Sequence, residues 1–152
     1  MTEKTLIIAK PDAVQRGLTG EIIKRFENRG FKLVAAKFMK VSRELAEKHY
    51  GVHKDKPFFD AVCTYISSSP VMVMVWEGIN IIELSRNMIG ATDAAQAGGG
   101  TIRGDYGLTK SYNLVHGSDS VESASVEIPL YFNEDEIVDY DMAINPWLAE
   151  DA

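Results

Sequence analysis

A histidine that follows a glycine-rich, arginine-bearing segment is the group in this sequence best suited to chemistry. Thr92, Thr101 and Arg103 lie in the segment 91–112, which leads to His116 in the string NLVHGSD. An arginine offers a planar fork of donors to phosphate oxygens, and threonine hydroxyls with glycine-exposed backbone N–H groups can complete an anion cradle. A neutral imidazole beside such a cradle is a nucleophile toward phosphorus. On spacing alone, however, a histidine beside glycine is more often structural than catalytic.

Two familiar catalytic arrangements do not fit the same residues. The phosphate-loop pattern G-x-x-x-x-G-K-[ST] is absent, and the string AGGGTIRG lacks its lysine, which disfavours a Walker-type ATPase or an adenylate-kinase-like phosphotransferase. Ser118 and Asp119 follow His116 too closely to form a protease-like triad.

Apolar runs and amphipathic stretches predict the elements that position this chemistry. The predicted strands are 4–10, 31–41, 70–76 and 113–116, and the predicted helices are 20–29, 42–50, 57–66, 80–90 and 120–132. Ser42 and Asn80 are expected to cap their helices. The segment 91–112 has no sustained periodicity and reads as a long functional loop. The order β-α-β-α-α-β-α-loop-β-α predicts one sheet with helices packed on it.

Composition predicts one soluble domain over residues 1–152, with an acidic tail from about 133 to 152 in which Trp147 favours docking. The net charge of −6 argues against nucleic acid or anionic lipid as main partner. No apolar run is long enough to cross a membrane, and the start lacks a secretion pattern, so a cytoplasmic location is expected. Cys63, the single cysteine, is predicted to be a core residue.

Five blocks of the sequence resemble the nucleoside diphosphate kinase family, in the family's order and spacing. They are TLIIAKPDAVQRGLTGEIIKRFENRGFK, HYGVHKDKPFFDAV, SSSPVMVMVWEG, GATDAAQAGGGTIRGDYG and NLVHGSDSVESA. The resemblance implies an α+β sandwich, with a ferredoxin-like antiparallel four-stranded sheet and helices packed on it. It also implies ATP and other nucleoside di- and triphosphates as substrates, Mg²⁺ as cofactor and a homo-oligomer. The tail NPWLAEDA resembles hexamer-type termini, which favours a hexamer over a tetramer.

Matching positions assign roles around the histidine. By this resemblance His116 takes the phosphate, Glu127 orients its ring, Ser118 supports Glu127, and Tyr50 lies near the nucleophile. Lys10 meets the phosphate and the sugar hydroxyl. Without the resemblance, Glu127 would read as part of a solvated helix face and Lys10 as a solubilising strand end.

The remaining matches bind the nucleotide. Phe58 corresponds to the ring on which the base stacks, and Asn113 to the partner of the sugar hydroxyl. Asp119 is expected to meet magnesium through water. The distal phosphates are assigned to Arg86, Thr92 and Arg103. For Arg86 the other interpretation is an exposed helix arginine.

The implied reaction is a two-step exchange in which a donor triphosphate phosphorylates His116 and an acceptor diphosphate then recovers the phosphate. Three positions depart from the family pattern: Ala13 replaces a frequent glycine, and Ala94 and Gly99 stand where prolines are usual. A different class of function is a catalytically silent nucleotide- or nucleic-acid-binding regulatory protein of the same fold. The complete set of matched residues and the acidic balance argue against it.

Overall fold

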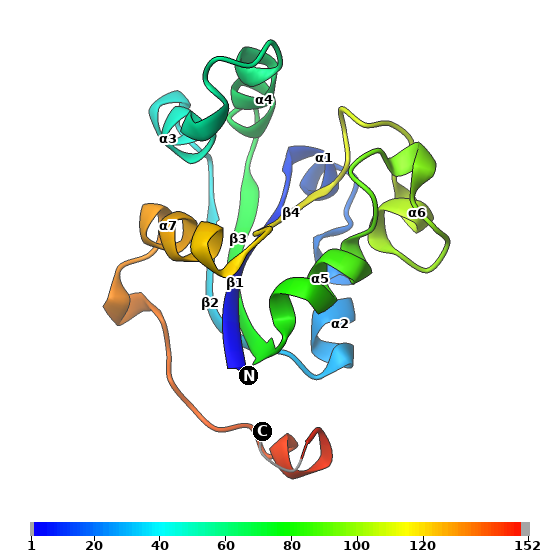
Figure 1. Ribbon diagram of the computed structural model, residues 1–152, viewed down its shortest axis with the longest axis vertical. Coiled ribbons are helices and arrows are strands. Elements are labelled where there is room, and N and C mark those ends of the chain that lie inside the picture. The colour runs from blue at the N-terminus through cyan, green and yellow to red at the C-terminus, as the bar shows by residue number, and fades with distance from the viewer. Residues whose placement is uncertain (1, 150–152) are drawn as a thin grey trace.

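A four-stranded antiparallel sheet forms the centre of the computed structural model, which describes residues 2–149 (Figure 1). The strands are β1 (Thr2–Ala9), β2 (Lys32–Met39), β3 (Val71–Ile79) and β4 (Val115–Gly117). Their order across the sheet is β2-β3-β1-β4, with every neighbouring pair antiparallel. This is the ferredoxin-like sheet that the family resemblance implied.

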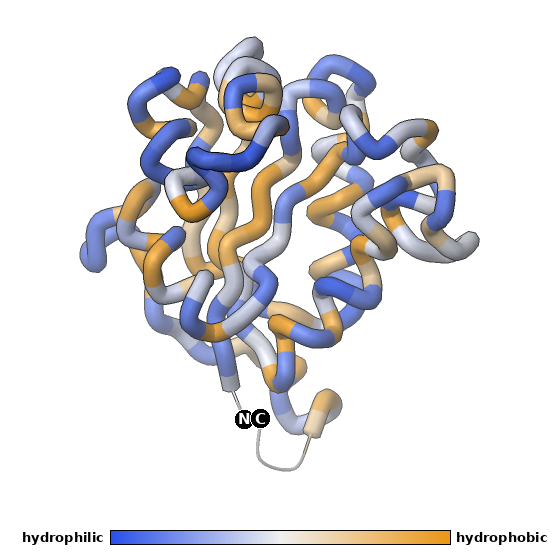
Figure 2. Tube along the Cα trace, turned by 45° about the horizontal axis from the view of Figure 1, so that its top comes forward, coloured by the Kyte–Doolittle hydropathy of each residue, from blue (hydrophilic) through white to orange (hydrophobic). Residues whose placement is uncertain are grey.

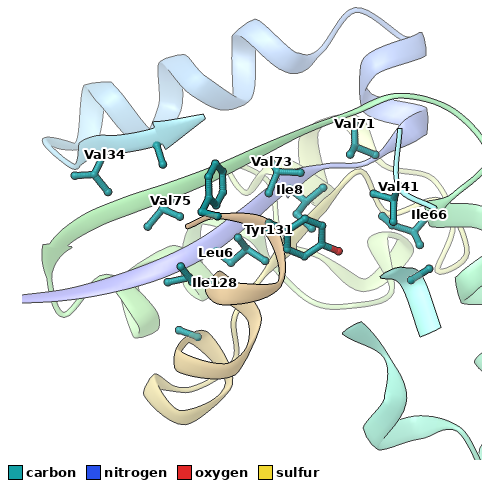
Figure 3. Close-up of a cluster of buried hydrophobic side chains, with 14 of the residues drawn as sticks. Leu6, Ile8, Val34, Val41, Ile66, Val71, Val73, Val75, Ile128 and Tyr131 are labelled. Atoms are coloured by element: carbon teal, nitrogen blue, oxygen red, sulfur yellow. The ribbon is translucent and has the colours of Figure 1, made fainter. Parts of the chain in front are cut away.

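Helices cover both faces of the sheet because the inner strands are apolar on both faces. In β1, Leu6 and Ile8 belong to one buried cluster, whereas Ile7 and Ala9 belong to the other. Figure 2 shows hydrophobic stretches along the strands at the centre of the trace. The first cluster, drawn in Figure 3, packs against α3 (Arg43–His49), α4 (Phe59–Ile66) and α7 (Val121–Tyr131). The second packs against α2 (Thr19–Arg29) and α5 (Ile81–Ile89).

The segment 91–112 is not the structureless loop that its sequence predicted. It contains a 3₁₀ turn, η2 (Ala94–Gln96), and a short helix, α6 (Ile102–Tyr106). The Thr101 hydroxyl caps α6 by accepting a hydrogen bond from the Gly104 N–H at 2.9 Å. A helix of five residues is too short to show a hydrophobic period, which is why the pattern was missed.

Other local predictions also need correction. A helix that was not predicted, α1 (Pro11–Gln15), follows β1 directly. α4 begins at Phe59 rather than at Pro57, after the 3₁₀ turn η1 (Gly51–His53). Asn80 adopts a left-handed conformation with φ 53° and makes no side-chain cap. The carboxylate of Glu3 accepts from the Ile82 N–H in its place.

The C-terminal tail docks on β2, but not through Trp147. The Val138 N–H donates to the Val34 carbonyl at 2.8 Å, and the Tyr140 hydroxyl donates to the Leu33 carbonyl at 2.6 Å. Two 3₁₀ turns lie along the tail, η3 (Glu134–Glu136) and η4 (Asn145–Trp147). The Trp147 side chain is 88% exposed, so the docking role expected of it is wrong.

Two smaller expectations have clear outcomes. Cys63 is fully buried in the first cluster, as predicted, and burial raises the pKa of its thiol. Within residues 2–149, no helix has the length and apolar character needed to cross a membrane.

Candidate active site

His116 lies in β4, opposite Ile8 of the central strand β1. In Figure 1 the end of β4 lies between the α3–α4 pair and the segment that carries α5 and α6. The backbone turns sharply just before it, because Leu114 is left-handed with φ 73°. Asp12 holds this turn, because one of its carboxylate oxygens accepts from the Leu114 N–H at 3.2 Å. The other carboxylate oxygen accepts from the Tyr65 hydroxyl of α4.

The imidazole of His116 is fixed through one nitrogen. Its Nε2 lies 2.8 Å from Oε1 of Glu127, which α7 presents to the sheet. The hydroxyl of Ser118 donates to the same oxygen at 2.8 Å and accepts from the Leu6 N–H at 3.1 Å. Because a carboxylate only accepts, Nε2 carries the ring proton and Nδ1 keeps a lone pair. Among the described residues, Nδ1 has no hydrogen-bond partner.

Burial keeps this histidine neutral. Desolvation lowers the pKa of His116 to about 4, although the hydrogen bond to Glu127 acts in the opposite direction. For Glu127, burial would raise the pKa, but the hydrogen bond with His116 and the polar interaction with His49 outweigh it, and the pKa falls below its usual range. At neutral pH the site therefore contains an uncharged imidazole held by an ionised carboxylate.

Asn113 is hydrogen-bonded to two other predicted site residues. Its Oδ1 accepts from Lys10 Nζ at 2.8 Å, and its Nδ2 donates to the Thr92 carbonyl at 3.0 Å. Burial is the main reason that the pKa of Lys10 falls to about 7, and the nearby Arg103 charge adds to the effect. The Thr92 side chain is exposed.

The two predicted phosphate arginines are held differently. Arg103 is buried and donates to three backbone carbonyls, those of Asn113, Gly90 and Val115, at 2.7 to 3.1 Å. Arg86 of α5 makes one hydrogen bond within residues 2–149, from Nη1 to the Gly117 carbonyl at 3.3 Å. Burial and the charge of Arg86 lower the pKa of Arg103 to about 10. A bound anion would reduce the electrostatic repulsion between these neighbouring cations.

The other predicted residues surround this centre at different distances. The Tyr50 ring lies edge-on to that of His116, with centroids 6.4 Å apart, and burial raises the pKa of its hydroxyl. Phe58 is 46% exposed and contacts His53 rather than the histidine centre. Asp119 is exposed, and its Oδ1 accepts from the Ser123 hydroxyl at 2.6 Å.

Sequence reasoning missed two residues of the site. His49 is the last residue of α3, and its ring lies 4.7 Å from that of His116. Asp12 received no role from the family resemblance, yet it holds the turn at Leu114. The signal for Asp12 was its place two residues after Lys10 at a strand end. For His49 the sequence offered no signal beyond its neighbour Tyr50.

One cluster has the spacing of a metal site. The nitrogen and oxygen ligand atoms of His49, His116 and Glu127 lie within 4.8 Å of one another. Because His116 and Glu127 already share a 2.8 Å hydrogen bond, we interpret the cluster as an acid-base network.

The arrangement as a whole places an uncharged imidazole nitrogen with a lone pair near the cationic side chains of Lys10 and Arg103. A family model described as nucleoside diphosphate kinase matches residues 3–137. The chain belongs to the nucleoside diphosphate kinase family. Relatives of that name share 57% identity in Synechocystis and 55% in Carboxydothermus hydrogenoformans. Each alignment covers 97% of this chain and 99% of the relative.

Solved structures support the same assignment. The chain superposes on a nucleoside diphosphate kinase from Halobacterium salinarum in complex with CDP with a TM-score of 0.95, at 48% identity, covering 98% of this chain and 99% of that one. A transition-state mimic of the Borrelia burgdorferi enzyme, with bound vanadate and ADP, gives 0.91 at 37% identity, covering 97% and 98%. As a nucleoside diphosphate kinase, the protein is a phosphotransferase acting on nucleotides.

Proposed function

We propose that the protein moves the terminal phosphate of a nucleoside triphosphate to a nucleoside diphosphate through Nδ1 of His116. The observation that carries this proposal is the 2.8 Å contact between Nε2 and Glu127, which leaves Nδ1 with a lone pair and no protein partner in the described chain. A nucleophile is strongest when an adjacent group fixes its tautomer and orientation. Here Glu127 does both.

In the first half-reaction, the Nδ1 lone pair forms a bond to the γ-phosphorus while the bond from phosphorus to the bridging oxygen breaks. The diphosphate leaves with that electron pair. In the second half-reaction, a terminal oxygen of an acceptor diphosphate attacks phosphorus, and the electron pair of the P–N bond returns to Nδ1. Lys10, Arg86 and Arg103 are assigned to neutralise the phosphate charge, so that catalysis rests on positioning and electrostatics.

The proposed substrates are magnesium complexes of ATP and other nucleoside di- and triphosphates. Asp119 fits a contact to hydrated Mg²⁺, because its side chain is exposed and only Oδ1 has a protein donor among residues 2–149. The metal, when bound, would neutralise charge on the phosphates. The exposed ring of Phe58 suits stacking on any base, since every base has a π-face.

The assembled network argues against a silent, purely regulatory protein. Such a protein has no need of a histidine whose one nitrogen is held and whose other is free, beside a lysine of lowered pKa. The cytoplasmic location and the low affinity for nucleic acid stay predictions.

Phosphoenzyme formation tests the proposal. We expect ATP labelled in the γ-phosphate to label the protein with magnesium present, giving a bond that is acid-labile and alkali-stable, and we expect ADP to remove the label. His116→Asn should abolish labelling. Full labelling of that variant would exclude His116 as the nucleophile.

A further inference from the structure

His49 is buried against the nucleophile, yet the reaction as described does not use it. Its side chain is 1% exposed and ends α3. Its ring stacks on Tyr50, with centroids 4.4 Å apart and planes 7° from parallel, and meets the His116 ring edge-on. A buried imidazole needs polar partners for both nitrogens. Those partners show what the residue does.

The two nitrogens of His49 face different groups of α7. Nδ1 lies 2.7 Å from the Tyr131 hydroxyl. Nε2 has no hydrogen-bond partner within residues 2–149, but it lies 3.7 Å from Oε2 of Glu127. That separation is too long for a good hydrogen bond and short enough for a direct charge–dipole interaction.

Electrostatics selects the tautomer. If Tyr131 donates to Nδ1, the ring proton is on Nε2 and points toward the carboxylate. In the other tautomer, a lone pair on Nε2 would face the lone pairs of an ionised Glu127 across 3.7 Å in a buried place. The first arrangement attracts and the second repels. Tyr131 therefore donates, and the Nε2–H of His49 faces Oε2.

We propose that His49 is a positioning residue, whose Nε2–H restrains the second oxygen of Glu127 so that the first oxygen keeps the proton on Nε2 of His116. Glu127 then lies between two imidazole N–H groups, with the Ser118 hydroxyl as a third donor. Without His49, Oε2 would be buried without a facing N–H, and the carboxylate would become more basic.

The consequence falls on the second half-reaction. When the P–Nδ1 bond breaks, its electron pair stays on the ring. If Nε2 still carries its proton, the leaving group is a neutral imidazole, whereas loss of that proton to Glu127 or solvent would require an imidazolate anion to leave. His49 lowers the basicity of Glu127 and therefore keeps the phosphorylated ring a good leaving group. The inference rests on the proposed function, because it presupposes phospho-His116.

Single-turnover kinetics on isolated phosphoenzyme tests the proposal. His49→Phe keeps the aromatic ring and removes both nitrogens, whereas His49→Gln retains an N–H donor. We expect His49→Phe to slow transfer to ADP about tenfold, the scale of a lost polar partner of a charged group. We also expect its rate to fall at higher pH than in the parent, because loss of the facing N–H makes the His116–Glu127 pair release its shared proton to solvent less readily. KM for ADP should change little, and His49→Gln should recover most of the rate.

Tyr131→Phe provides a second variant, because it removes only the hydroxyl that fixes the tautomer. It should shift the pH profile in the same direction by a smaller amount. Unchanged rate and pH profile in His49→Phe would overturn the proposal, and so would equal losses in the Phe and Gln variants. Failure of the parent to form a phosphoenzyme would instead refute the proposed function.

The tautomer can be measured in the unmodified protein, which keeps the proposal testable if His49→Phe does not fold. The proposal requires ¹⁵N chemical shifts for His49 that show a protonated Nε2 and an unprotonated Nδ1. A protonated Nδ1 in the free enzyme would overturn it.

Discussion

Arg86 and Arg103 carry the same charge but are held by the chain to very different degrees. Arg103 spends three of its five N–H donors on backbone carbonyls that shape the segment before His116. Arg86 spends one. The assigned role of both is phosphate binding, but only Arg103 is also a structural cross-link.

Substitution should separate these two roles. We expect Arg86→Ala to lose about 2 kcal/mol or more of transition-state stabilisation, roughly thirtyfold in kcat/KM, with little change in Tm. Arg103→Ala should lose at least as much activity and also lower Tm, because three backbone carbonyls, two of them in buried hydrogen bonds, lose their donor. Kinetics and thermal unfolding on both variants check this. Equal Tm values for the two variants would contradict the structural role of Arg103.

Lys10 gives the site a pH dependence whose sign can be worked out. With its pKa lowered to about 7, Lys10 is mostly neutral in the free protein at pH 8. A bound diphosphate favours the charged form and raises the pKa again, so binding takes up a proton. Affinity for ADP should therefore fall as pH rises above 7.

Calorimetry can count that proton. We expect ADP binding at pH 8 to take up about one proton, seen as a dependence of the binding enthalpy on the buffer's ionisation enthalpy. Lys10→Arg should abolish the uptake, because a guanidinium stays protonated throughout this range. Uptake that is the same in parent and variant would assign it to another group.

At the scale of elements, the strands and longer helices could be predicted and the short helices could not. The run PVMVMVW gave β3 because it is covered on both faces, and its residues divide between the two buried clusters. α1 and α6 span five residues each, so they depend on caps and tertiary contacts rather than on periodicity. The role of His49 could not be predicted either, because it depends on the tertiary contact between α3 and α7.

Gly99, which stands where the family usually has proline, lies in the turn before α6. The Thr101 N–H donates to the Gly98 carbonyl at 3.2 Å, and Gly100 has φ 92°. These features define a type II turn with Gly99 at its second position, where proline is favoured. A Cβ atom at Gly99 would meet nothing within 4 Å.

Gly99→Pro should therefore stabilise the protein, by about 0.4 to 1 kcal/mol per subunit, because proline reduces the entropy of the unfolded loop. Gly100→Ala is the matched control, since it also meets no neighbour but must adopt a positive φ, and it should destabilise. Thermal unfolding of the three proteins measures both effects. With saturating magnesium ADP, the difference between parent and Gly99→Pro should narrow, because the ligand would hold this segment in both. A less stable Gly99→Pro would show that the turn has another geometry.

On the scale of the whole molecule, apolar side chains are exposed at places that suit contacts between copies. Phe38 lies on the edge strand β2 and is 59% exposed, and Leu108 lies in the segment 91–112 and is 80% exposed. Within residues 2–149, the tail bonds the edge of β2 at Leu33 and Val34, through Tyr140 and Val138. An edge strand pairs readily with its own copy about a two-fold axis. On the hypothesis of a hexamer, we propose a two-fold contact at Phe38 and a separate three-fold contact at Leu108.

A closed hexamer that has both a two-fold and a three-fold axis needs both contacts. Disrupting one contact should therefore leave the smaller oligomer that the other contact forms. We expect native mass spectrometry to give six copies for the parent, predominantly three for Phe38→Glu and predominantly two for Leu108→Glu, because a charge placed in either patch removes one kind of contact and leaves the other. Val52→Glu is the matched control: Val52 is 86% exposed and belongs to η1, which is part of neither β2 nor the segment 91–112, and its variant should remain hexameric. A parent of four copies would exclude the hexamer. Loss of the same contact in both variants would show that Phe38 and Leu108 belong to one surface.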